Sequence, residues 1–246
     1  MTARPESYAE AFLSYFDIYF VSTPAMLDDL ARIRYRVYCE EFGYEDKSAF
    51  PDGLELDEFD SQALHCMVVH KGSGTPAGCV RVVKTVGDAP LPFEKYCSDS
   101  LDANFFRINH MPRETMCEVS RLAVDGPFRR RAGEQATRYG GIHISDLSQQ
   151  EKRTFPLIAV SCFLAATALT DLMSNTNAFA MMEPFLPRML ARSGIKFTKV
   201  GQDIDYHGLR APYFVTTQSA VGNMVPDLKE LYDAIRSRVK ADFDKA

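Results

Sequence analysis

The chain has 246 residues, of which 46% are hydrophobic and 25% charged, and its formal net charge is -5. This length and composition are typical of a globular α/β protein with a substantial core. The acidic balance argues against a general nucleic-acid binder, for which an excess of Lys and Arg is expected, so we expect no nucleic acid as a partner.

Cysteine and histidine usage indicates the cellular compartment and whether a metal cofactor is expected. Six cysteines lie singly along the chain, without a C-x-x-C pair, which favours reduced thiols and a cytoplasmic location. The five histidines show no spacing of metal ligands, so we expect no metal site.

The N-terminus has no basic region followed by an apolar core, and we expect no signal peptide. The most apolar run, residues 155–173, contains Pro, Ser, Thr and Asp, and predicts a buried helix rather than a membrane span. We therefore do not expect an integral membrane protein.

Hydrophobic periodicity and turn residues predict alternating helices and strands. The predicted helices are residues 5–15, 25–42, 156–173, 185–192 and 226–240. The predicted strands are residues 16–21, 63–70, 77–84, 117–124, 178–182, 197–200 and 213–217. Residues 86–115 are predicted to be rich in loops, and the polar, basic stretch 128–152 to be an insertion loop. This order predicts a single α/β domain over residues 1–246, with an N-terminal arm and a C-terminal helix.

The apolar strand at 117–124 contains two charged residues, Glu118 and Arg121. Side chains alternate along a strand, so these two are predicted to point to opposite sides. A charge inside a buried strand costs several kcal/mol unless it is paired, because the ion loses its water. The strand therefore predicts partners elsewhere in the chain. Cys117, next to Glu118, has no histidine placed to activate it and is predicted to be a core residue.

Candidate partners come from separate segments of the chain. Together with Glu118 and Arg121 they are Arg34, Glu55, Asp57, Asp60 and Arg81. Three carboxylates within six residues raise one another's pKa unless arginines neutralise them. A cleft that holds such carboxylates can bind a cationic amine and take its proton. The alternative is an ion-pair network that only supports the fold.

These residues resemble the signature of the acyl-homoserine-lactone autoinducer synthases, which have the GNAT acyltransferase fold. The resemblance implies a mixed central sheet flanked by helices, with a core at about residues 17–217. The resemblance rests, in order, on Arg34-x-x-x-Tyr38, Tyr44, Glu55-x-Asp57-x-x-Asp60, Arg81 and Glu118-x-x-Arg121. The second half is similar to the acyltransferases associated with exosortase and PEP-CTERM protein-sorting systems. That similarity rests on Met182-Glu183-Pro184, Leu190-Ala191-Arg192-Ser193-Gly194-Ile195 and Tyr206-His207-Gly208-x-Arg210-x-Pro212-Tyr213. N-acyl amino acid synthases are similar in outline. Tyr38 and Tyr44 stand where the autoinducer synthases usually carry Phe and Trp.

The resemblance implies an N-acyltransferase that moves a fatty acyl group from a thioester to the amine of an amino acid or a related small molecule. Glu118 is then the expected base, with Glu55 as the second candidate. The expected substrate-binding residues are Arg34, Tyr38, Tyr44, Asp57, Asp60, Arg81, Phe93 and Arg121. Phe93 enters as a candidate pocket aromatic, for which simple loop packing is the alternative. His207 is predicted to be a turn residue rather than a second proton carrier.

The acyl donor is expected to lie against Leu122, Ala123 and Val124, whose backbone N–H groups would polarise the thioester carbonyl. Residues 130–135 match the pyrophosphate-binding motif of the CoA-dependent GNAT enzymes only in part, which favours an acyl carrier protein over acyl-CoA. Arg129, Arg130 and Arg131 are the predicted docking patch for that acidic carrier, with a solvated loop as the alternative. No permanently bound cofactor is expected. Two other functions stay open: synthesis of an acyl-homoserine lactone from S-adenosylmethionine, and a non-catalytic sensor that binds an acyl carrier.

Overall fold

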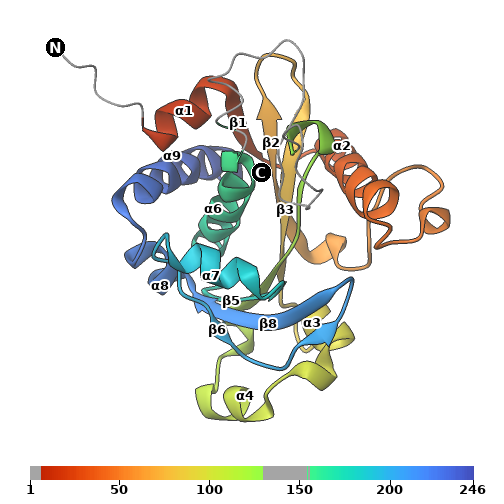
Figure 1. Ribbon diagram of the computed structural model, residues 1–246, viewed down its shortest axis with the longest axis vertical. Helices are drawn as coiled ribbons and strands as arrows, with labels where there is room; N and C mark the ends of the chain where they lie inside the picture. Colours follow the sequence, from red (N-terminus) through yellow and green to blue (C-terminus); the bar gives the residue numbers. More distant parts are fainter. Residues whose placement is uncertain (1–6, 130–153, 155) are drawn as a thin grey trace.

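The computed structural model describes residues 7–129, 154 and 156–246 (Figure 1). Within this part of the chain, eight strands form one sheet in the order β1-β2-β3-β4-β5-β8-β6, and β7 pairs with β8 beside this path. The strands are β1 (Phe16–Phe20), β2 (Ala63–His70), β3 (Pro76–Lys84), β4 (Met116–Val124), β5 (Asn177–Met182), β6 (Thr198–Lys199), β7 (Ile204–Asp205) and β8 (Leu209–Thr216). Strands β4 and β5 are parallel, whereas the other neighbours are antiparallel. The sheet is therefore mixed, as predicted.

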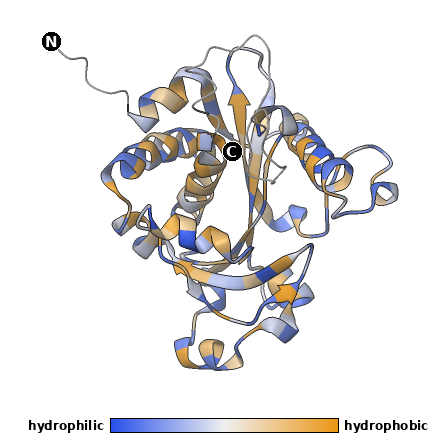
Figure 2. Cartoon of the chain, in the orientation of Figure 1, coloured by the Kyte–Doolittle hydropathy of each residue, from blue (hydrophilic) through white to orange (hydrophobic). Residues whose placement is uncertain are grey.

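Helices cover both faces of the sheet. They are α1 (Tyr8–Tyr15), α2 (Pro24–Arg34), α3 (Pro92–Tyr96), α4 (Ala103–Asn109), α6 (Pro156–Leu172), α7 (Phe185–Ala191), α8 (Thr217–Gly222) and α9 (Pro226–Phe243). Helix α6 packs on β2, β3 and β4 and against α9, while α2 packs on β3 and β4 from the other side (Figure 1). Figure 2 shows that α6 is hydrophobic along most of its length, whereas α2 and α9 also carry hydrophilic residues. Helix α6 is thus the central helix of the core.

Local signals in the sequence explain several helix boundaries. Thr23 caps α2 by accepting a hydrogen bond from the backbone N–H of Met26, and Pro24 occupies the first turn. The predicted helix at 25–42 continues past Arg34 as a π-helix, Tyr35–Glu41, which ends before Gly43 at a φ of 61°. π-helical turns are rare and concentrate at functional sites.

Two predicted regions differ from the structure. The loop-rich region at 86–115 contains the short helices α3 and α4. The last strand begins at Leu209 rather than at residue 213, and so includes Pro212, which the prediction placed just before the strand. Pro212 has no N–H to donate, but its carbonyl accepts a hydrogen bond from Val200 at 2.9 Å. A proline is tolerated at this position because Val200 donates the hydrogen bond and needs only the Pro212 carbonyl as its acceptor. Most of the predicted insertion at 128–152 lies outside the described residues.

Buried side chains bear out the predicted core. All six cysteines are free thiols and buried, and Cys117 is a core residue, as predicted. In the part of the chain that the structure describes, no helix has both the length and the apolar character needed to cross a bilayer. The same residues contain no group of three or more His, Cys, Asp or Glu placed to hold a metal ion.

Candidate active site

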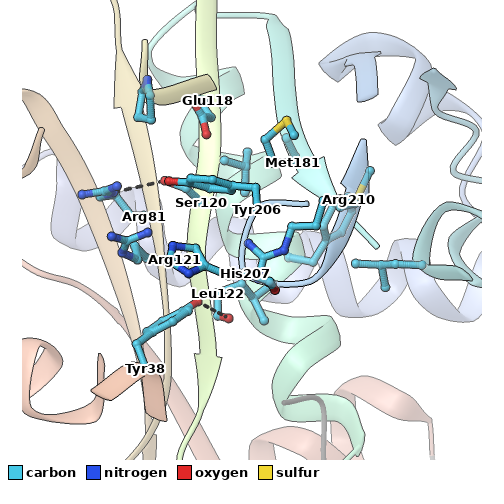
Figure 3. Close-up of a pocket in the computed structure, with 16 residues that line it drawn as sticks. Tyr38, Arg81, Glu118, Ser120, Arg121, Leu122, Met181, Tyr206, His207 and Arg210 are labelled. Atoms are coloured by element: carbon cyan, nitrogen blue, oxygen red, sulfur yellow. Dashed lines mark hydrogen bonds between the residues drawn. The ribbon is translucent and has the colours of Figure 1, made fainter. Parts of the chain in front are cut away.

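Strand β4 carries a β-bulge opposite β3. Cys79 pairs with Ala123 and Arg81 with Ser120, so β4 has one residue more than β3 between these two pairs. Arg121, inside the bulge, has a φ of 50°, in the left-handed region. The bulge interrupts the alternation of side chains along the strand. The prediction that Glu118 and Arg121 point to opposite sides is therefore wrong, and both line one cavity (Figure 3).

The cavity lies where β4 and β5 separate. The two strands pair only between Met116–Glu118 and Asn177–Phe179, after which β5 continues to Met182 along β8 alone. A cavity of about 90 Å³ opens here, lined by residues 118–122 of β4 and residues 180–182 of β5. Phe163 of α6, Leu186 of α7 and residues of the turn between β7 and β8 complete its wall. The diverging strands leave the β5-facing backbone of β4 beside this space.

Glu118 is the buried carboxyl of the cavity. Its side chain accepts a hydrogen bond from the backbone N–H of Phe93 at 2.7 Å. Burial raises the pKa of Glu118 to about 8, although that hydrogen bond and the guanidinium groups of Arg81 and Arg121 oppose the rise. A carboxyl with a pKa near neutral pH can take up and release a proton under physiological conditions. The geometry therefore suits Glu118 to proton transfer in this cavity.

An ion-pair cluster lies beside the cavity. It contains the guanidinium groups of Arg34, Arg81 and Arg121 and the carboxylates of Glu45, Glu55, Asp57 and Asp60. Arg81 Nη1 lies 2.6 Å from Asp57 Oδ1, and Arg121 Nε lies 3.1 Å from Glu55 Oε1. Arg81 and Arg121 line the cavity, whereas the carboxylates that bind them lie behind the cavity wall. The cluster therefore fixes the position of these two side chains.

Glu55 and Arg34 form the fully buried centre of the ion-pair cluster. Arg34 donates hydrogen bonds to Glu55 and, at 2.7 Å, to Asp60. Burial alone would raise the pKa values of Glu55 and Asp60, but Arg34 together with the other guanidinium groups nearby outweighs it and holds both below their ordinary values. The structure does not place Arg34, Glu55, Asp57 or Asp60 on the cavity wall. An ionised, doubly paired Glu55 behind the wall is poorly placed to take a proton from a substrate.

Comparison with known proteins agrees with this architecture. Residues 33–138 match the family described as the acetyltransferase (GNAT) domain. BjaI, a CoA-dependent acyl-homoserine lactone synthase solved with SAM and isopentyl-CoA, gives a TM-score of 0.59 at 17% identity over 89% of each chain. MesI, another CoA-dependent acyl-homoserine lactone synthase, gives 0.58 at 17% identity over 90% of this chain and 95% of its own. FeeM, an N-acyl amino acid synthase from uncultured soil microbes, gives 0.56 at 14% identity over 87% of this chain and 97% of its own.

The chain has the GNAT acyltransferase fold. The predicted fold class, a mixed sheet flanked by helices, is confirmed. Identities of 14% to 17% show the fold alone, so the reaction has to be inferred from the site. No curated protein matches the chain in sequence. The association with exosortase systems stays a prediction.

Two tyrosines of the π-helix and its following loop support the bulge of this GNAT fold. The Tyr38 hydroxyl donates a hydrogen bond to the Leu122 carbonyl at 3.1 Å, and the Arg121 guanidinium lies 5.3 Å from the centre of the Tyr38 ring. Tyr38 lines the cavity, as expected for a substrate-binding residue. Tyr44 lies one layer behind, packed on Phe42 and on the ring of His207. Tyr44 therefore supports the wall rather than forming it.

Phe93 contributes differently from the prediction. Its ring is buried and stacks on Phe179, with 4.9 Å between the ring centres, and it does not line the cavity. The alternative of simple packing holds for the side chain, because α3 places it in an aromatic cluster. The backbone N–H of Phe93, however, donates to Glu118. A pattern of side-chain types cannot reveal such a backbone contact.

The residues predicted to bind the acyl donor divide into three groups. Leu122 lines the cavity, whereas Ala123 and Val124 are buried in the core. Arg129 is also buried, where it pairs with Glu41 and lies over the Phe42 ring, so it is not part of an exposed patch. Arg130 and Arg131 lie outside the described residues.

Tyr206 and Arg210 line the cavity although neither was a site candidate, and Glu45 belongs to the ion-pair cluster without lining the cavity. Glu45 Oε1 lies 2.9 Å from Arg121 Nη2 and 3.7 Å from His207 Nε2, although nothing in its sequence context distinguishes it. His207 is in a turn, as predicted, with a φ of 54°, yet its ring lines the cavity. The Tyr206-His207-Gly208-x-Arg210 segment was the available signal.

A second, smaller cavity of about 20 Å³ adjoins the first and is almost wholly apolar. The two share Val119, Phe163 and Ala180 as wall residues. The smaller one extends between α6 and β8 as far as Thr170 and Ala220. The three shared residues are apolar, so the smaller cavity continues the apolar side of the larger one toward the core.

Proposed function

We propose that the protein is an N-acyltransferase that moves a fatty acyl group from a thioester to the amine of an amino acid or a related small molecule. One observation carries the proposal: a buried carboxyl, Glu118, with a pKa of about 8, stands where β4 and β5 diverge. The GNAT fold and the apolar side of the cavity support it.

The proposed reaction is a direct transfer. The ionised Glu118 accepts a proton from the substrate ammonium, and the neutral amine attacks the thioester carbonyl carbon. A C–N bond forms, and the carbonyl oxygen becomes an oxyanion that the backbone N–H groups around residues 122–124 stabilise. When the oxyanion collapses, the C–S bond breaks and the thiolate leaves, taking the proton from Glu118, while the newly bonded nitrogen releases its extra proton to solvent. The products are an N-acyl amide and a free thiol, and Glu118 is ionised again.

The ion-pair cluster holds this machinery in place. Its four carboxylates exceed its three guanidinium groups by one negative charge, so its field favours a cationic amine in the adjoining cavity. In this account Arg81 and Arg121 contact the substrate, while Arg34, Glu55 and the two aspartates are positioning residues.

The acyl chain lies along the apolar side of the cavity. Phe163 and Ala180 line both cavities, so a chain whose thioester lies against Leu122 points toward the smaller cavity, which at about 20 Å³ has to widen to hold a fatty acyl chain. The walls contain mostly apolar side chains, which suit a hydrocarbon and not a second polar substrate.

The donor is an acyl thioester, and we propose an acyl carrier protein as its vehicle. The incomplete pyrophosphate motif at residues 130–135 supports a carrier protein over CoA. MesI and BjaI are CoA-dependent by their descriptions, so acyl-CoA is the competing donor. Arg130 and Arg131 remain the proposed docking residues.

Synthesis of an acyl-homoserine lactone is the second candidate, because MesI and BjaI carry out that synthesis. The size of the cavity favours a smaller acceptor. At about 90 Å³, a volume that must also admit the thioester, the cavity is small for S-adenosylmethionine.

Mass spectrometry of lipid extracts from cells that express the wild type, Glu118→Gln or Glu114→Gln tests the proposal. Glu114 is exposed and lies just before β4, so its variant is a matched control. We expect an N-acyl amino acid in the wild type and in Glu114→Gln, and none in Glu118→Gln. An acyl-homoserine lactone instead would establish the second candidate. If no acyl product forms even when a carrier protein is co-expressed, the proposal is wrong and the sensor hypothesis gains.

A further inference from the structure

A helix of five residues, α3, supplies the backbone N–H that reaches Glu118. The helix begins at Pro92, and the N–H of its second residue, Phe93, donates to the Glu118 carboxylate at 2.7 Å. N–H groups in the first turn of a helix have no acceptor within the helix, so they can donate to groups outside it. Burial raises the pKa of Glu118, and among the groups that oppose the rise this N–H has the largest effect, ahead of Arg81 and Arg121. The position of α3 therefore bears directly on the ionisation of Glu118.

Helix α3 is too short to be stable without tertiary contacts. Isolated helices of fewer than about 12 residues are marginal in water. The buried Phe93 ring stacks on Phe179, which anchors the side chain but leaves the direction of the backbone N–H to the rest of the turn. Glu58 accepts hydrogen bonds from Lys95 and Tyr96, but these side chains are exposed, and exposed ion pairs contribute little. A stronger contact to the first turn comes from the segment just before β4.

Glu94 and Arg113 form this contact. The Glu94 carboxylate accepts a hydrogen bond from the backbone N–H of Leu91, just before the helix, at 2.7 Å. Both of its oxygens also accept hydrogen bonds from the Arg113 guanidinium, the longer one at 2.8 Å. The same guanidinium donates to the Ala89 carbonyl, ahead of the helix. Two parallel hydrogen bonds fix a carboxylate and a guanidinium in both distance and direction, so the start of α3 is held at several points.

Arg113 is itself fixed next to the strand that carries Glu118. It begins a short 3₁₀ turn, Arg113–Thr115, directly before β4, and Glu118 is the third residue of that strand. The Arg113 carbonyl accepts a hydrogen bond from the Thr85 hydroxyl, just after β3, at 2.8 Å. A closed ring of contacts thus runs from Arg113 through Glu94 and α3 to Glu118, and back along the chain to Arg113.

We infer that Glu94 and Arg113 are positioning residues for the base: their ion pair holds the first turn of α3 so that the Phe93 N–H stays on the Glu118 carboxylate. Neither of the two residues lines the cavity. The inference rests on the proposed function for the role of Glu118 as the base. The titratable and charged groups that face Glu118 are Arg81 of β3, Cys117 and Arg121 of β4, Glu94 and Cys97 at α3, and Tyr206 of the turn before β8.

A positional effect has to be separated from a charge effect, because the charge of Glu94 also raises the pKa of Glu118. In Arg113→Gln both effects act in the same direction, since Glu94 loses its counter-charge and α3 loses its clamp. The double variant Glu94→Gln/Arg113→Gln removes one charge of each sign, so the net charge near Glu118 stays the same and the clamp is still lost. Arg107→Gln is the control, because Arg107 is exposed on α4 and donates to Asn104.

Carbon-13 NMR of carboxyl-labelled glutamate measures the pKa of Glu118 in each variant, with its signal identified by its absence from Glu118→Gln. We expect a pKa near 8 in the wild type and in Arg107→Gln. In Arg113→Gln and in the double variant it should be about one pH unit higher, as expected when a hydrogen bond to a charged group is weakened. Arg113→Lys keeps the charge but cannot form two parallel hydrogen bonds, and should show a smaller rise. The inference is overturned if the double variant titrates like the wild type or, should that variant fail to fold, if Arg113→Lys does.

The pH dependence of acyl transfer separates this inference from the proposed function. If both hold, Arg113→Gln should be about 10-fold slower than the wild type at pH 7 and approach the wild-type rate at pH 10, because its base ionises about one pH unit later. If acyl transfer is found and Arg113→Gln is slowed by the same factor at every pH, the pair supports only the fold and the inference is overturned. If the pKa shifts in the NMR titration but no acyl transfer is found, the inference stands and only the proposed reaction is wrong.

Discussion

Glu118→Gln should stabilise the protein at alkaline pH while it abolishes turnover. The folded chain raises the pKa of Glu118 from its ordinary value of 4.5 to about 8, because burial penalises the ionised carboxylate. Below pH 4.5 the carboxyl is protonated in the folded and the unfolded chain, so it has no effect on stability. Between pH 4.5 and about 8 the unfolded chain loses the proton while the folded chain keeps it. The free energy of unfolding therefore falls by about 1.4 kcal/mol per pH unit in this range.

Above pH 8 the loss is constant, at about 5 kcal/mol as an upper value. Glutamine cannot ionise, and its carbonyl can still accept the hydrogen bond from the Phe93 N–H. In urea denaturation, the free energy of unfolding of Glu118→Gln should thus be close to that of the wild type at pH 5 and higher by several kcal/mol at pH 9. For the exposed control Glu114→Gln, the free energy of unfolding should stay within about 0.5 kcal/mol of the wild-type value at both pH values.

The same variant should lower kcat by about 10²- to 10⁴-fold, the usual contribution of a general base. A variant that gains stability while it loses activity is expected where a catalytic group is kept in the protein at a cost to stability. If wild type and Glu118→Gln change stability in parallel from pH 5 to pH 9, the raised pKa is refuted and Glu118 loses its claim as the base.

Three further predictions follow from the same site. The rate of acyl transfer should rise with pH through about 8, because only ionised Glu118 accepts a proton; a profile that is flat between pH 6 and 9 would exclude this role. Glu55→Gln should lower the free energy of unfolding by about 3–5 kcal/mol, because it leaves the buried charge of Arg34 poorly compensated; a urea midpoint equal to that of the wild type would contradict the buried pair. Ala180→Leu should narrow the path between the two cavities and reduce kcat/KM for long acyl chains about 10-fold or more relative to acetyl; an unchanged chain-length profile would place the acyl chain elsewhere.

Charges in an apolar context were the most informative signal in the sequence. Glu118 and Arg121 stand in a buried strand, and the need to compensate them predicted the partners that the structure brings together. The ion-pair network was one of the two interpretations left open, and Glu55 and Arg34 fulfil it. Arg81 fits both the ion-pair network and the substrate-binding cleft, because it pairs with Asp57 and also lines the cavity.

Features that depend on tertiary pairing could not be predicted. The bulge at Arg121 arises from the register between β4 and β3, and no residue type in β4 marks it. Glu45, which belongs to the ion-pair cluster, lies in an irregular segment, and Arg210 comes from the start of β8, remote in sequence from β4. Phe93 acts on Glu118 through its backbone, which is independent of side-chain type. Periodicity thus predicted an α/β domain, whereas part of the cavity wall depends on long-range contacts.

Reconstitution with purified components tests the central claim most directly. Wild type, Glu118→Gln and Glu114→Gln are incubated with fatty acyl carrier protein or fatty acyl-CoA and a mixture of amino acids, and products are measured by mass spectrometry. We expect the wild type and Glu114→Gln to release an N-acyl amino acid and a stoichiometric thiol, and Glu118→Gln to release neither above background. Equal yields from Glu118→Gln and the wild type, or no N-acyl amino acid with either donor, would contradict the account.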